Sequence, residues 1–130
     1  MLHPNQFHVN EAWIAFQLND TPIVTIRDGS FNCVCLMDAA SCYIMGHVMV
    51  PADQSEPSAR EAKRLLRLGW AHKSAYPGKL LVPTGRYQTD LAAEAKRQGI
   101  AFVPVPASHL RSFTSDARQE FREFLRGKPR

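Results

Sequence analysis

The sequence predicts a mixed α/β fold in which three antiparallel strands come first and alternating helices and strands follow. Three apolar runs, each about as long as a strand, fill residues 21–50. Asp28-Gly29 is a strong hairpin signal between the first two runs, and residues 38–41 form a looser turn before the third. The later alternation indicates βαβ units with right-handed crossovers. We therefore expect the order β-β-β-α-β-α-β-α, with helices on both faces of the sheet.

Length and composition are those of an ordinary globular protein. The chain has 130 residues and a formal net charge of +4, so we expect one domain over residues 1–130 with a core that needs no disulfides. No apolar run approaches the ~20 residues of a membrane span, and the N-terminus lacks a signal-peptide pattern. Three cysteines without a Cys-x-x-Cys motif indicate buried thiols, no cofactor and a cytoplasmic location.

Residues 1–20 allow two interpretations. The residues that would share one face of a helix are Val9, Ala12, Trp13 and Phe16. Residues 13–18 also match a short buried strand. In either case we expect the segment to pack on the sheet, because Trp13 and Phe16 would be costly to leave in water.

We assign the three apolar runs to strands over residues 22–27, 31–37 and 42–50. The third strand is largely apolar on both of its faces, which is typical of a central strand covered on both sides. His47 lies in this strand among apolar neighbours. A core or half-buried histidine is therefore expected there, and not a metal ligand.

The remaining elements carry clear helix and strand signals. A helix over residues 59–72 begins with a capping box formed by Ser58 and Glu61. Its core stripe is expected to contain Ala62, Leu65, Leu66 and Trp70. The later elements are a strand over 79–82, a helix over 90–98 capped by Thr89, a strand over 100–103 and a helix over 116–126.

Two stretches have a distinctive order. Asp38-Ala39-Ala40-Ser41 leads into Cys42-Tyr43-Ile44, and Leu80-Leu81-Val82-Pro83-Thr84-Gly85-Arg86-Tyr87-Gln88-Thr89 leads on to Gly99-Ile100. In order and spacing these stretches resemble the integrase and transposase catalytic cores of the ribonuclease H-like superfamily. The resemblance covers residues 21–126 and implies a ribonuclease H-like fold.

The resemblance also implies a two-metal site for phosphoryl transfer, which needs clustered carboxylates to hold the cations. The first acid belongs in the first strand, where the strand expected over residues 22–27 has none and Val24 takes its place. The second belongs at the end of the fourth strand, where Pro83 stands. The acids available for the third position are Asp116, Glu120 and Glu123. One acid cannot hold two metal ions, so we expect a degenerate site without catalytic or metal-binding residues.

An alternative hypothesis is a metal-dependent nuclease or phosphoryl-transfer enzyme with a relocated carboxylate set. The candidates are Asp38, Asp116 and Glu120. Asp38 is the best placed of them because it lies at the end of a strand. We prefer to interpret it as a turn residue that bonds its own backbone.

Two helices carry rows of cations. The candidate nucleic-acid-binding residues are Arg60, Lys63, Arg64 and Arg67 on the first helix, and Arg118, Arg122 and Arg126 on the last. Solvated faces are the ordinary interpretation of such rows, and charge pairing with Glu120 and Glu123 is expected on the last helix. A basic row can also lie along a phosphate backbone.

The favoured hypothesis is a non-catalytic ribonuclease H-like domain that acts as a binding module. Its partner would be nucleic acid or another protein, and not a membrane. A third hypothesis is a small α/β protein with an unrelated pocket, which would show a different strand order.

Overall fold

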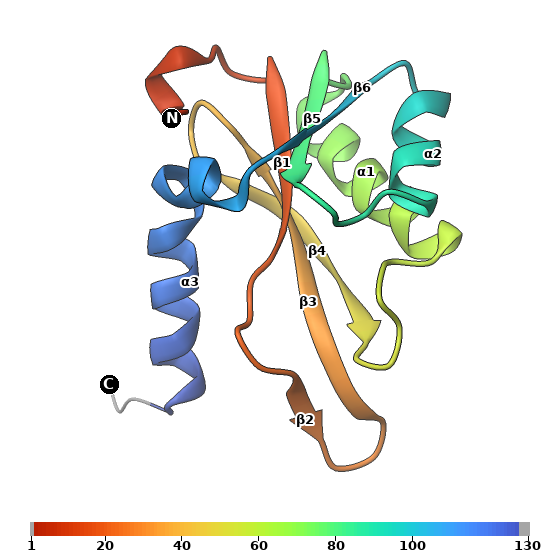
Figure 1. The fold of residues 1–130 in the computed structure, drawn as a ribbon, viewed down its shortest axis with the longest axis vertical. Helices are drawn as coiled ribbons and strands as arrows, with labels where there is room; N and C mark the ends of the chain where they lie inside the picture. The colour runs from red at the N-terminus through yellow and green to blue at the C-terminus, as the bar shows by residue number, and fades with distance from the viewer. Residues whose placement is uncertain (1, 128–130) are drawn as a thin grey trace.

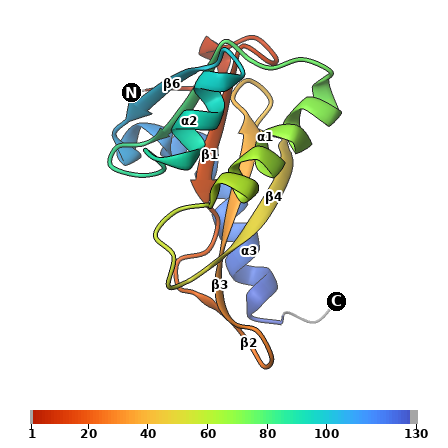
Figure 2. The ribbon, with the colours of Figure 1, turned by 90° about the vertical axis from the view of Figure 1, so that its right-hand side faces the viewer.

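The computed structural model describes residues 2–127, which form a six-stranded mixed sheet with helices on both faces (Figures 1 and 2). The strands are β1 (Ala12–Gln17), β2 (Ile23–Thr25), β3 (Gly29–Asp38), β4 (Ile44–Pro51), β5 (Lys79–Pro83) and β6 (Ala101–Val105). The helices are α1 (Ala59–Lys73), α2 (Asp90–Arg97) and α3 (Arg111–Leu125), with short 3₁₀ turns η1 (Pro4–Gln6) and η2 (Ala107–Leu110). None of the described helices has the length and apolar character needed to cross a membrane.

The strands follow the order β4-β3-β1-β5-β6, and β2 pairs with the start of β3. Strand β3 is antiparallel to β1, β2 and β4, whereas β1, β5 and β6 are parallel. Phe16 of β1 lies opposite Cys35 of β3, and Leu81 of β5 lies opposite Val103 of β6. The expected α/β class, with antiparallel strands first and parallel strands after them, is confirmed.

The central strand β1 corrects the prediction for the N-terminal half. Of the two interpretations of residues 1–20, the strand is right, and the segment belongs to the sheet instead of packing on it. The strand expected over residues 22–27 is only three residues long in the structure, as β2, and Val24 in it is 79% exposed. A strand covered on both faces has no alternation of apolar and polar residues, so its pattern does not separate it from a helix.

Strand β4 also differs from its prediction. It pairs only with β3 and therefore lies at an edge of the sheet, with exposed His47 and Met49. The central position and the buried histidine predicted for this strand are both wrong. Met45 is an extra residue where the register shifts opposite Leu36 and Met37, and this β-bulge moves Ile44 to the other face.

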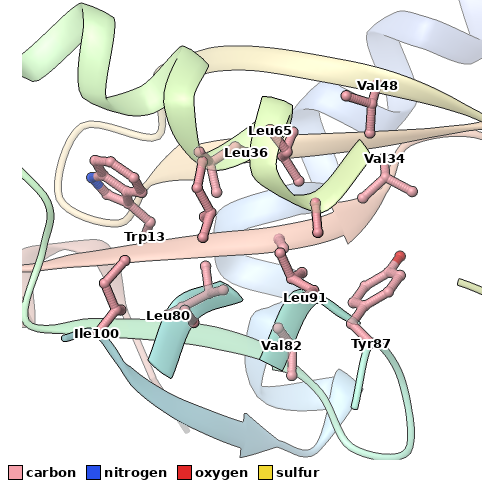
Figure 3. Close-up of a cluster of buried hydrophobic side chains, with 14 of the residues drawn as sticks. Trp13, Val34, Leu36, Val48, Leu65, Leu80, Val82, Tyr87, Leu91 and Ile100 are labelled. Atoms are coloured by element: carbon pink, nitrogen blue, oxygen red, sulfur yellow. The ribbon is translucent and has the colours of Figure 1, made fainter. Parts of the chain in front are cut away.

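Two apolar clusters hold the helices against the two faces of the sheet. One lies between the sheet and the helices α1 and α2, and it contains Trp13, Leu36, Leu65, Leu80 and Leu91 (Figure 3). The other lies on the opposite face, where α3, η1 and η2 cover the sheet (Figure 1). The sheet is thus covered on both sides.

Helix α1 begins with the predicted capping box, in which Ser58 Oγ accepts from the Glu61 amide at 3.2 Å and Glu61 Oε1 accepts from the Ser58 amide at 2.8 Å. The helix lies very close to the sheet at Gly69, where a Cβ would be 2.7 Å from the Trp13 ring. Trp70 is 47% exposed, so its predicted place in the core is wrong. The buried residue at this point of the helix is Gly69.

The other helices begin differently from their predictions. Thr89 provides no side-chain cap for α2, and the carboxylate of Glu56 accepts from the amides of Gln88 and Thr89 instead. Helix α3 begins at Arg111, five residues earlier than expected, because the apolar side chain of Phe113 is already buried in the second cluster.

Candidate functional site

The exposed side of α1 forms a basic surface with aromatic side chains. Its cations lie at positions i, i+3, i+4 and i+7, so they share one helix face. We define the α1 surface by Arg60, Lys63, Arg64, Arg67, Trp70 and Tyr76, which line an open hollow of about 820 Å³. All of its cations are exposed. The ion pairs among residues 2–127 lie elsewhere, on Glu94 and Asp20.

The α1 surface continues toward the edge of the sheet. A second hollow of about 310 Å³ lies beside it, between α1 and β4, and it is lined by His47, Met49, Arg60, Glu61 and Arg64. At the other end of the helix, the ring of His72 stacks on Tyr43 with centroids 4.8 Å apart. The cationic face therefore borders an unpaired strand edge and aromatic rings.

The second predicted row of cations, on α3, is partly neutralised. Asp20 accepts hydrogen bonds from Arg118 Nη2 and Arg122 Nε, both at 2.6 Å. The hydrogen bonds from Arg122 and Arg118 hold the pKa of Asp20 below its usual value. Arg126 is exposed at the end of the helix. The predicted pairing with Glu120 and Glu123 is thus replaced by an ion-paired acid from the β1–β2 connection, which no local sequence signal indicates.

A smaller hollow lies where β1 and β5 end against α3. We call it the strand-end hollow; its volume is about 170 Å³ and its lining includes Phe16, Gln17, Pro83, Arg86, Tyr87 and Arg118. Arg86 Nη2 donates to Gln17 Oε1 at 3.3 Å, and its guanidinium lies 5.1 Å from the centre of the Tyr87 ring. This hollow carries cations and no acidic lining residue.

Comparisons with solved structures decide the fold. The chain is similar to the catalytic core of HTLV-2 integrase in complex with magnesium, with a TM-score of 0.60 and 9% identity over 93% of this chain and 76% of that one. For the catalytic core of BIV integrase the TM-score is 0.54, with 10% identity over 93% and 75%. The chain has the ribonuclease H-like fold.

A larger assembly gives the same fold. The chain matches an intasome structure of simian T-cell lymphotropic virus in complex with PP2A regulatory subunit B56 gamma, with a TM-score of 0.58 and 13% identity. The match covers 91% of this chain, which spans only 39% of that chain. The sequence matches no protein-family model and no curated protein.

The ribonuclease H-like sheet shows which residues stand at the acid positions named by the resemblance. The first strand is β1, so Val24 on the distant β2 hairpin does not take the place of the first acid. Strand β1, with the sequence AWIAFQ, contains no acid of its own. Pro83 is the last residue of β5, the strand that follows α1. Both strand ends meet at the strand-end hollow, together with Arg118 of α3.

The three acids of the alternative hypothesis are not assembled in the ribonuclease H-like fold. Asp38 is fully buried and accepts hydrogen bonds from the Asn10 amide at 2.7 Å, the Ser41 amide at 3.0 Å and the Ser41 hydroxyl at 2.9 Å. Its predicted role in the turn is confirmed. Asp116 and Glu120 are exposed on α3. Among residues 2–127, no three His, Cys, Asp or Glu side chains are grouped so that they could hold a metal ion.

Proposed function

We propose that this chain is a non-catalytic ribonuclease H-like domain that binds single-stranded nucleic acid through the α1 surface. The observation that carries the proposal is the row of exposed cations beside Trp70 and Tyr76. Such a row attracts a phosphate backbone by charge, and aromatic rings beside it offer faces on which unpaired bases stack.

The non-catalytic part of the proposal is supported by the strand ends. Two-metal phosphoryl transfer needs carboxylates that converge on two cations. In this chain Gln17 ends β1, Pro83 ends β5, and Arg86 and Arg118 place positive charge beside them. Cations at this position repel the divalent ions that such chemistry requires.

The nucleic-acid part is supported by the charge balance around α1. Glu61 is the acid nearest in sequence to the cations, and its Oε1 atom is occupied by the Ser58 amide and by Gln54 Nε2, each within 2.9 Å. Lys63 lies within electrostatic range of the Glu94 carboxylate. Arg60, Arg64 and Arg67 form no ion pair among the described residues, so their charge is available to an outside partner. Binding of a phosphate backbone releases the counterions of the nucleic acid, and this release supplies most of the affinity of such surfaces.

The aromatic side chains favour single strands over duplexes. Trp70 is 47% exposed beside the hollow, so its ring is accessible to an unpaired base. Stacking of one base on an aromatic side chain is worth about 1–3 kcal/mol. A duplex keeps its bases stacked inside and offers α1 its phosphates alone.

We further propose that residues 1–130 form one domain that works in the cytoplasm. The cysteines are free thiols, and the Sγ atoms of Cys33 and Cys35 lie 4.0 Å apart without a bond between them. Buried unpaired thiols suit a reducing compartment. One structural neighbour is an intasome in complex with PP2A regulatory subunit B56 gamma, which supports a protein partner in addition to nucleic acid.

The test is a fluorescence-anisotropy titration with a labelled single strand of about 20 nucleotides and with the matching duplex, at low salt. We expect the wild-type protein to bind the single strand more tightly. The variant Arg60→Ala/Arg64→Ala/Arg67→Ala should lose about tenfold or more in affinity, because three phosphate contacts disappear. Trp70→Ala should weaken single-strand binding and leave duplex binding nearly unchanged.

The matched control is Arg27→Ala/Lys79→Ala/Arg111→Ala, which removes the same charge from exposed positions outside the α1 surface. Equal losses in both triple variants would show that net charge alone drives binding. That result, or no binding of either nucleic acid at low salt, would contradict the proposed function.

A further inference from the structure

We propose that the strand-end hollow binds a single phosphate group, either as free phosphate or as the terminal phosphate of a nucleic-acid strand. The site is made by Arg86 and Tyr87 after β5, by Arg118 of α3 and by Gln17 at the end of β1. The hollow is separate from the α1 surface. The phosphate proposal therefore does not depend on the proposed function.

Two residues that line this hollow, Tyr87 and Arg118, each have a buried hydrogen-bond donor without a partner. Among the atoms of residues 2–127, the Tyr87 hydroxyl and Arg118 Nε are the buried side-chain polar atoms that make no hydrogen bond. An unpaired buried donor costs about 1–3 kcal/mol, so native proteins rarely keep one without reason. Both of these donors belong to residues that line the same hollow, which points to one acceptor that serves them together.

The backbone at Tyr87 supports the same conclusion. Tyr87 has a φ of 61°, in the left-handed region, although a bulky side chain disfavours that region. Its ring fills the end of the core beside Val82 and near the end of β1 (Figure 3), and only 1% of the residue is exposed. Strained backbone of this kind is held in place by surrounding packing and is concentrated at functional sites.

Charge decides the class of ligand. Arg118 shares Asp20 with Arg122, since its Nη2 atom and the Nε atom of Arg122 bind that carboxylate. Arg86 has no acidic partner among the ion pairs of the described residues, and it contacts the neutral Gln17. The hollow therefore keeps a positive excess beside two donors, which suits an anion whose oxygen atoms accept hydrogen bonds.

Size and geometry favour a phosphate group. The volume of about 170 Å³ is smaller than the pockets of ~300–1,000 Å³ that hold drug-sized ligands. It therefore fits one small anion, and not a whole nucleotide. Its donors come from two separate elements, the β5–α2 loop and α3, and a tetrahedral ion has oxygen atoms that can accept from both.

The experiment is an NMR titration of the ¹⁵N-labelled full chain with inorganic phosphate at constant ionic strength, read on the Nε–H signal of Arg118 and the amides of Arg86 and Tyr87. We expect saturable shifts that sodium chloride does not produce. A strand with a 5′-phosphate is compared with the same strand without it. Shifts at lower concentration with the phosphorylated strand would assign the terminal phosphate as the source, and equal or weaker effects would assign free phosphate.

The variant Tyr87→Phe keeps the ring and removes only the unpartnered hydroxyl, so it should fold normally and bind phosphate about tenfold more weakly. Arg118→Gln should weaken binding at least as much. Arg111→Gln, an exposed change on the same helix, is the matched control and should bind like the wild type. Shifts that do not saturate, or wild-type affinity in Tyr87→Phe, would overturn the proposal. The α1 surface is unchanged in these variants. A failure of the proposed function would therefore appear in the single-strand titration, independently of the phosphate titration.

Discussion

Tyr87 combines several features that packing alone does not explain. Its hydroxyl is buried, its backbone is left-handed and its ring lies under the Arg86 guanidinium. A phenylalanine would fill the same space without an unpaired polar atom. Packing therefore does not require the hydroxyl, which is why we assign it to the proposed phosphate site.

The ionisation of Tyr87 gives a prediction at this scale. Burial raises the pKa of Tyr87 to about 12, above its ordinary value of 10.0, because the phenolate would lose its hydration. The raised pKa means that its contribution to stability is complete below pH 10 and is lost as the pH rises through about 12. Subtracting the absorbance titration of Tyr87→Phe at 295 nm from that of the wild type should give a midpoint near pH 12. A midpoint near pH 10 would contradict this burial.

Asp38 shows the opposite case of an acid whose role is local. It stands at a strand end, where a metal ligand is conceivable, yet Ser41 and Asn10 satisfy its carboxylate. The Asp38–Ser41 pair could be predicted because it lies within one turn. The contact of Asp20 with Arg118 joins residues 98 positions apart, so no local pattern could predict it.

At the scale of elements, α1 connects the core to the proposed binding surface. Its buried side packs on β3, β4 and α2, and Ala62, Leu65 and Leu66 belong to the shared core cluster. Its opposite side presents the cations. The helix lies so close to the sheet that two glycines, Gly46 of β4 and Gly69 of α1, have no room for a Cβ.

Gly69→Ala tests this close packing. Alanine favours a helix over glycine by about 1 kcal/mol, but the added methyl would meet the Trp13 ring at 2.7 Å and Leu36 at 2.8 Å. Overpacking of this kind costs about 1–3 kcal/mol, so we expect a net loss of stability in urea unfolding. Ala71→Gly, at an exposed position of the same helix, isolates the propensity effect. A stabilised Gly69→Ala protein would contradict the packing described here.

The strands explain why the sequence predicted some elements and missed others. The hairpin near Asp28-Gly29 and the capping box of α1 depend on neighbouring residues, and both were predictable. The predicted two-residue turn is wrong in detail, because the turn spans residues 26–28 and Gly29 already pairs with Thr25. Strand β1 is buried on both faces and β4 contains a bulge, so neither keeps a simple alternation. Whether a strand lies at the edge or in the centre of the sheet depends on pairing partners that are far away in the sequence.

At the scale of the whole molecule, a ribonuclease H-like architecture is combined with a strand-end hollow lined by Arg86 and Arg118 and by no acidic residue. The fold was predictable from the sequence, and so was the end of β5 at Pro83. The prediction placed the first acid position at Val24, because the first strand was sought at residues 22–27 and not in β1. The strand-end hollow could not be predicted, since it combines β1, the loop after β5 and α3.

The central claim is that the α1 surface binds a phosphate backbone, and the salt dependence of binding tests it most directly. For single strands, the slope of log K against log salt is about −0.7 for each phosphate contacted. The slope of Arg60→Ala/Arg64→Ala/Arg67→Ala should therefore be shallower than that of the wild type by about 2, while Arg27→Ala/Lys79→Ala/Arg111→Ala should keep the wild-type slope. Equal slopes for the wild type and the α1 variant would contradict the claim.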